Sequence, residues 1–142
     1  MSCVFVWESF RAIKAFSGFV SGPDFFQSTE VIARDPRFDR LRVIHNDFLK
    51  ITGHSIDEAT CRRVNICRRG ALRTNPNFRV TFVAVGEVAA QLARSIETSD
   101  HSMPFFPNIC SSLADAQAWF DGLAPLDSPR EVLTDAAAHQ AR

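Results

Sequence analysis

Two strands joined by a turn are predicted at the start of the chain. Hydrophobic and polar residues alternate loosely along residues 3–19, where Val, Phe, Ile and Trp are frequent. A period of two is typical of strands, and the polar pair Glu8 and Ser9 indicates the turn between them. Phe10 and Lys14 fall out of phase with this alternation. A β-hairpin is expected in spite of these two positions.

A helix is predicted next, over residues 22–34. Ser21 and Asp24 form an S-x-x-D start signal, in which the serine hydroxyl accepts a hydrogen bond from an exposed amide of the first turn. Asp35 precedes a proline and therefore resists helical backbone angles, which ends the helix.

The stretch from Leu41 to Glu58 comes next and predicts a strand followed by a helix, an order that the rest of the chain repeats. Leu41, Val43 and Ile44 predict a strand buried on both faces, as in a parallel sheet covered by helices. The polar residues 45–47 are expected to end this strand. Ser55 and Glu58 then form a capping box for a helix that continues to about residue 69.

The second half of the chain repeats the order of strand followed by helix. Residues 78–85 form the clearest apolar run, and a helix begins at Glu87 with apolar residues recurring every three or four positions. Pro107 cannot donate a hydrogen bond to a sheet, so a strand over 105–110 is expected at a sheet edge. Ser112 caps another helix, and a short additional helix is predicted over 128–137.

These elements predict one α/β domain with a mixed, mainly parallel sheet. The N-terminal β-hairpin supplies an antiparallel edge, and the helices lie on the faces of the sheet. We expect the domain to span residues 1–124 and a C-terminal extension to occupy residues 125–142.

Composition limits the possible partners. Sixteen basic and sixteen acidic residues cancel, so no global field attracts nucleic acid, and no nucleic-acid partner is expected. The N-terminus lacks the basic region of a signal peptide, and its apolar run is too short to span a bilayer. We expect a cytoplasmic protein with no integral membrane association.

The sequence contains no recognisable catalytic or metal-binding motif. The four cysteines have no metal-site spacing and are interpreted as buried, reduced thiols: Cys3, Cys61, Cys67 and Cys110. The sequence has no G-x-S-x-G, H-E-x-x-H or phosphate-binding loop. We therefore expect a non-enzymatic protein with no cofactor, no metal and no catalytic residue.

The order of elements resembles the SpoIIAA-like proteins, which are related to STAS domains and to small Sec14-type lipid-binding domains. The resemblance is carried by residues 18–25, 35–47, 78–97 and 113–123. It implies a regulatory module that acts through protein–protein interaction. In anti-sigma factor antagonists the loop after the central strand carries a phosphorylated serine preceded by aspartate. The matching loop lacks the aspartate, and Thr52 and Ser55 are its candidate phosphate acceptors.

A crevice at the carboxyl ends of the strands is one candidate site. Open α/β sheets bind ligands there, and polar or small residues follow three of the predicted strands. These candidates are His45, Asn46, Asp47, Gly86 and Ser111. The alternative is structural, with Asp47 capping a turn and His45 forming hydrogen bonds while half-buried.

A basic surface on the second helix is another candidate site. Arg62, Arg69 and Arg73 project at nearly one angle, and Ile66 lies among them. An exposed branched residue among arginines is typical of an interface, and the arginines suit an anionic group. A solvated polar face is the simpler interpretation, and a homodimer is the expected assembly.

The many phenylalanines allow two interpretations of the interior. They fill an ordinary core, or they line an apolar pocket as the Sec14-type relation implies. The sequence therefore favours a regulatory protein-binding module, with a carrier or sensor of a lipid or other small apolar molecule as the alternative. A phosphorylation-switched anti-sigma factor antagonist is a third hypothesis.

Overall fold

A five-stranded mixed sheet forms the centre of the molecule. The computed structural model describes residues 1–97 and 107–123. The strands follow one another across the sheet in chain order; the β1–β2 pair is antiparallel and the other pairs are parallel. They are β1 (Ser2–Glu8), β2 (Arg11–Val20), β3 (Val43–His54), β4 (Arg79–Val83) and β5 (Asn108–Cys110). The predicted α/β fold with its N-terminal hairpin is confirmed.

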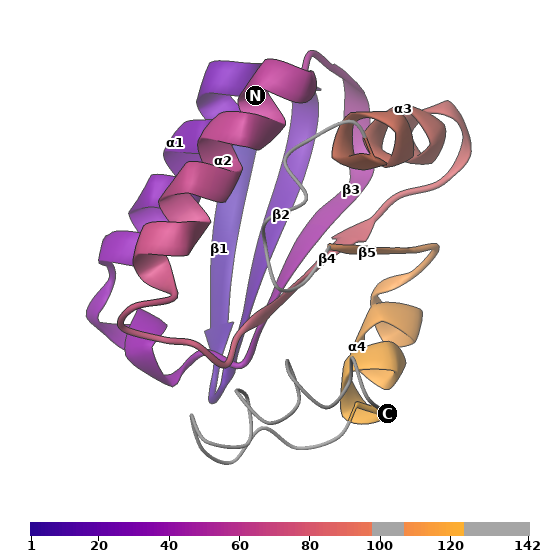
Figure 1. The fold of residues 1–142 in the computed structure, drawn as a ribbon. Coiled ribbons are helices and arrows are strands. Elements are labelled where there is room, and N and C mark those ends of the chain that lie inside the picture. Colours follow the sequence, from indigo (N-terminus) through magenta and orange to yellow (C-terminus); the bar gives the residue numbers. More distant parts are fainter. Residues whose placement is uncertain (98–106, 124–142) are drawn as a thin grey trace.

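Helices cover the sheet on both faces. Helices α1 and α2 lie side by side over one face (Figure 1). Helix α4 contacts β3, β4 and β5, and its Gln117 reaches His45 on the opposite face. The helices are α1 (Gly22–Arg34), α2 (Glu58–Ala71), α3 (Gly86–Glu97) and α4 (Leu113–Asp121), with a 3-10 turn at Pro36–Arg40.

Aromatic side chains form the core between the sheet and the α1–α2 face. Phe16, Phe25, Phe48 and Phe82 contact one another with ring centroids 4.9 to 5.8 Å apart. Tilted and edge-to-face pairs of this kind add to the stability that burial gives. The core therefore holds α1 firmly against β2, β3 and β4.

Strand β3 is longer than the sequence predicted. It begins at Val43 and continues to His54, so residues 45–47 lie within the strand instead of ending it. These polar residues stay in the sheet because β2 and β4 pair with them on both sides. A register shift between Ala15 and Ser17 then lets β2 follow β3 to its end. The expectation that the strand ends at residues 45–47 was wrong.

Helix α2 also begins differently from the prediction. Asp57, not Ser55, is its N-cap, and the Asp57 carboxylate accepts hydrogen bonds from the Thr60 amide at 2.8 Å and the Thr60 hydroxyl at 2.9 Å. Glu58 pairs with Arg62 at 2.7 Å. The Ser55 hydroxyl instead accepts a hydrogen bond from the amide of Gly22.

The remaining elements agree with the sequence where the structure describes them. Ser21 caps α1 and Ser112 caps α4, each through its side-chain oxygen. The predicted helix over 128–137 and the extension over 125–142 lie outside the described residues. None of the helices within residues 1–97 and 107–123 has the length and hydrophobicity that a membrane span requires.

Candidate functional site

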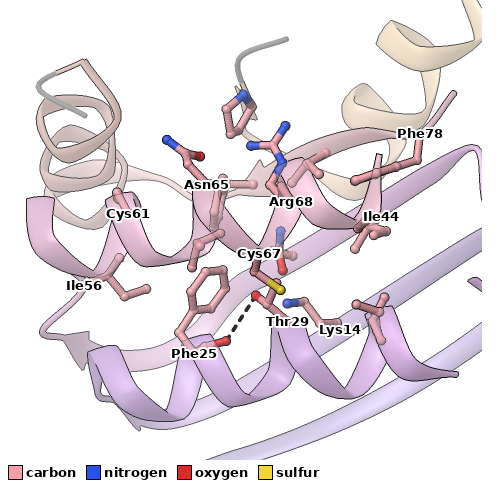
Figure 2. Close-up of a pocket in the computed structure, with 18 of the residues that line it drawn as sticks. Lys14, Phe25, Thr29, Ile44, Ile56, Cys61, Asn65, Cys67, Arg68 and Phe78 are labelled. Carbon is pink, nitrogen blue, oxygen red and sulfur yellow. Dashed lines mark hydrogen bonds between the residues drawn. The ribbon is translucent and has the colours of Figure 1, made fainter. Parts of the chain in front are cut away.

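A cavity of about 60 Å³ lies between the sheet and the helices α1, α2 and α3. Its wall is mostly apolar and includes Phe25, Ile44 and Phe82. Figure 2 shows the arrangement, with residues of α1 and α2 lining the cavity. Four polar side chains from the sheet and α2 also line this space: Lys14, Asn46, Asn65 and Arg68.

Lys14 is buried on the cavity side of β2, with 3% of its surface exposed. Its Nζ donates a hydrogen bond to Ser28 Oγ at 3.0 Å and lies 4.5 Å from the centroid of the Phe25 ring. Within the described residues no carboxylate lies within 4.0 Å of this amine. Burial lowers the pKa of Lys14 to about 7, and the nearby thiols of Cys3 and Cys67 oppose this only in part.

Asn46 is the neighbour of Lys14 in the sheet. The two residues are paired in the parallel register of β2 and β3 and share one face. Asn46 is 1% exposed, and its Nδ2 donates to the Thr81 carbonyl at 3.0 Å. Its Oδ1 is buried without a hydrogen-bond partner in the part of the chain that the structure describes. An unsatisfied buried acceptor is costly, so this atom indicates a place for a donor.

Arg68 reaches the cavity from α2, and 6% of its surface is exposed. Burial lowers the pKa of Arg68 to about 10, so the guanidinium remains charged at neutral pH. Burial also raises the pKa of the Cys61 thiol to about 11 and raises that of Cys67. The polar part of the cavity wall thus carries hydrogen-bond donors, the unpartnered Oδ1 of Asn46 and protonated thiols.

His45 lies next to Asn46 in β3 but faces α4. It is fully buried, and its ring nitrogens lie 2.6 Å from Thr81 Oγ1 and 3.0 Å from Gln117 Oε1. Arg11 also donates to Gln117 Oε1, at 2.9 Å. Burial lowers the pKa of His45, opposed by the hydrogen bond to Gln117. The neutral tautomer with a proton on Nε2 satisfies both contacts, which supports the structural interpretation of His45.

The predicted strand-end candidates do not gather at one cavity. Asp47 accepts a hydrogen bond from the Leu49 amide, and Ser111 donates one to Asp115. Gly86 begins α3 with a φ of +60°, a conformation that glycine adopts readily. Register places Asp47 beside Val83 near the ends of β4 and β5. Of the five candidates, Asn46 alone lines the cavity described above.

Thr52 and Ser55 lie at the end of β3 and are exposed. Thr52 belongs to the strand and not to a loop, and the Ser55 hydroxyl is hydrogen-bonded to the start of α1. Their phosphorylation stays a prediction.

The outer face of α2 carries the second group of candidates. Ile66 is 64% exposed; Arg62 and Arg69 of the same helix are exposed, as is Arg73, which lies just beyond the end of α2. Arg68 of the same helix does not belong to this basic surface, because it turns inward to the cavity. The structure thus separates an outer face of α2 from a cavity-lining face.

Sequence reasoning missed Lys14 and Arg68 as site residues. Lys14 had a visible signal, since it is a charged residue in phase with the buried Ala12 and Phe16 of the same strand. Arg68 had no comparable signal, because the helix is rich in arginine and only packing distinguishes the buried one. A metal site is a separate matter: the described residues contain no cluster of three or more metal-ligating side chains.

Comparison with known proteins identifies the fold. No protein-family model matches the chain, and no curated protein sequence matches it. Among solved structures, the anti-sigma factor antagonist SpoIIAA in its unphosphorylated form is similar, with a TM-score of 0.56 and 10% sequence identity. The match covers 86% of this chain and 100% of SpoIIAA. The protein is therefore a single α/β domain with the SpoIIAA (STAS) fold, as the sequence predicted.

Proposed function

We propose that this protein is a non-enzymatic binding module that takes a small, mainly apolar molecule into the cavity between the sheet and α1, α2 and α3. The observation that carries this proposal is the unpartnered Oδ1 of Asn46 beside the buried amine of Lys14. Ligand sites commonly combine an apolar wall with a few convergent polar groups.

The size of the cavity limits the ligand to a short molecule. A volume of about 60 Å³ accepts about four to six water molecules. A molecule with a similar number of non-hydrogen atoms fits, whereas a lipid chain requires the helices to move apart. The small-molecule form of the carrier or sensor hypothesis is therefore favoured over the lipid form.

The polar groups limit the chemistry of the ligand. Lys14 and Arg68 supply hydrogen-bond donors, and Asn46 Oδ1 accepts. A short alkyl chain that ends in a group with both a donor and an acceptor matches this arrangement. Propionamide is a suitable test compound because its amide offers both.

Titration with propionamide, followed by NMR of methyl-labelled protein, tests the proposal. We expect saturable shifts at Ile44 and Val80, which line the cavity. Asn46→Leu fills the space and removes the acceptor, so binding should weaken at least about tenfold, which corresponds to about 1.4 kcal/mol. Asp47→Asn is the matched control, because this neighbour faces away from the cavity, and it should bind as the wild type does. Absence of saturable shifts at these methyl groups contradicts the proposal.

A second candidate function is regulation through a protein partner, including a second copy of the chain. It is favoured by Ile66, the most exposed large hydrophobic side chain among the described residues, and by the likeness of the fold to an anti-sigma factor antagonist. Ile66→Asp should lower the mass that light scattering measures if the protein is a dimer. Val31→Asp, an equivalent change on α1 at a side chain that is also exposed, is the control. An unchanged mass with Ile66→Asp removes this residue from a dimer interface.

A further inference from the structure

We propose that Lys14 forms a reversible imine with a short-chain aldehyde or ketone that binds in the cavity. This inference rests on the proposed function, because it requires that the cavity admit a small molecule. It adds a ligand class, small carbonyl compounds, and a covalent attachment point.

The geometry leaves the amine of Lys14 available for reaction. The side chain extends from β2 toward the helices, near Thr29 and Cys67 (Figure 2). Its one hydrogen bond in the described part of the chain goes to Ser28 Oγ, and that hydroxyl donates its own proton to the Phe25 carbonyl at 2.6 Å. No described carboxylate holds the amine as an ammonium ion. Lysines that form imines in proteins are commonly activated by desolvation in an apolar pocket.

Desolvation makes the neutral amine abundant. With a pKa of about 7, half of the Lys14 side chains carry no charge at pH 7. An ordinary solvated lysine is neutral in only about one molecule per two thousand at that pH. The nucleophilic form is thus enriched roughly a thousandfold.

The neighbouring groups suit the reaction. The apolar wall accommodates the alkyl part of a carbonyl compound. Asn46 shares the face and register position of Lys14, and its unpartnered Oδ1 can accept a hydrogen bond from the hydroxyl of the carbinolamine intermediate.

The chemistry balances without another reagent. The lysine nitrogen forms a bond to the carbonyl carbon, and a proton moves from nitrogen to oxygen to give the carbinolamine. Loss of the hydroxyl with a proton from nitrogen releases one water molecule and leaves the C=N bond. Addition of water reverses the process, so the bond stores a ligand and does not turn it over.

The chain provides an internal control, because it contains only two lysines, Lys14 and the exposed Lys50. The experiment incubates the full chain at pH 7 with propanal and cyanoborohydride, which reduces an imine to a stable propyl amine. Peptide mass spectrometry then gives the rate of propylation at each lysine. We expect Lys14 to react at least about tenfold faster than Lys50, after allowance for its limited access.

Three controls identify the cause of a preference for Lys14. In urea the preference should disappear, because unfolding removes the cavity. Asn46→Leu should slow the labelling of Lys14 and leave Lys50 unchanged. Decanal, which exceeds the cavity, should label Lys14 no faster than Lys50.

The outcomes also separate this inference from the proposed function. Propionamide binding without preferential labelling of Lys14 overturns the imine and leaves the cavity as a non-covalent site. Equal labelling of both lysines in folded and unfolded protein likewise overturns it. Binding of propionate in place of propanal, with no adduct at Lys14, would assign the amine to an anion site and also overturns the imine. Absence of both binding and labelling contradicts both proposals.

Discussion

His45 and Asn46 are adjacent in β3 and equally buried, yet they differ in how their polar atoms are satisfied. His45 faces α4, where Thr81 and Gln117 occupy both of its ring nitrogens. Asn46 faces the α1–α2 side, where its Oδ1 lies unpartnered at a cavity. One strand thus carries a completed polar cluster on one face and an incomplete one on the other.

This difference distinguishes a structural polar group from a candidate binding group. A fully satisfied buried network adds rigidity and fixes how α4 packs on the sheet. An unsatisfied acceptor beside an apolar cavity lowers stability and supplies a contact for a ligand. The comparison predicts a large loss of stability when His45 is made apolar and little change when Asn46 is made apolar.

His45→Leu should produce the largest loss of stability. The change leaves the buried Thr81 hydroxyl without its partner and removes the contact to Gln117. We expect the free energy of unfolding to fall by about 2 to 3 kcal/mol. Urea denaturation measures this change, and a loss below about 1 kcal/mol would mean that the α4 side is no more dependent on its polar cluster than the cavity side.

Lys14→Met should stabilise the protein in a pH-dependent way. Because the pKa of Lys14 is lowered to about 7 in the folded state, the unfolded chain binds more protons between that value and the ordinary lysine pKa. The destabilisation by Lys14 is therefore full below pH 7 and disappears as pH rises toward 10. At pH 6 we expect Lys14→Met to raise the free energy of unfolding by about 1 to 4 kcal/mol. This stabilisation should decrease by about 1 kcal/mol between pH 7 and pH 8.

The cysteines also make stability depend on pH, because their raised pKa values lower stability as pH increases. Lys50→Met is the reference at each pH, because both variants keep the cysteines and the difference between them reports Lys14. A difference between the two variants that does not change with pH would show that the Lys14 amine keeps an ordinary pKa in the folded protein.

Asn46→Leu should have the smallest effect on stability. The variant loses the hydrogen bond to the Thr81 carbonyl but removes the unpartnered acceptor and fills part of the cavity. These contributions oppose each other, so we expect the free energy of unfolding to stay within about 1 kcal/mol of the wild type. Thermal and urea unfolding both measure it, and a loss as large as that of His45→Leu would identify Asn46 as structural.

The sequence predicts the secondary structure and fold of this molecule better than the residues of its cavity. Ser21 and Ser112 correctly predict the starts of α1 and α4, because an N-cap bonds to amides only a few residues away in the sequence. The sequence made Asn46 a candidate because it was expected at the end of a strand. That expectation was wrong, since β3 continues to His54. Its relation to Lys14 arises from pairing between strands distant in the chain, which no local pattern reveals.

The inward turn of Arg68 illustrates the same limit. Five arginines lie within residues 62–73 and look alike in sequence, and packing of α2 on the sheet decides which one reaches the cavity. Ser55 and Asp57 are both suitable N-cap residues for α2 in the sequence. Asp57 is the cap, because its carboxylate accepts the hydrogen bond from the Thr60 amide.

A crystal structure of the protein soaked with propionamide tests the central claim most directly. We predict density for one molecule in the cavity, with its amide hydrogen-bonded to Asn46 Oδ1 and its carbonyl facing Lys14 Nζ. A cavity that holds only an ordered water on Asn46 Oδ1, or that protein side chains close completely, would contradict the account.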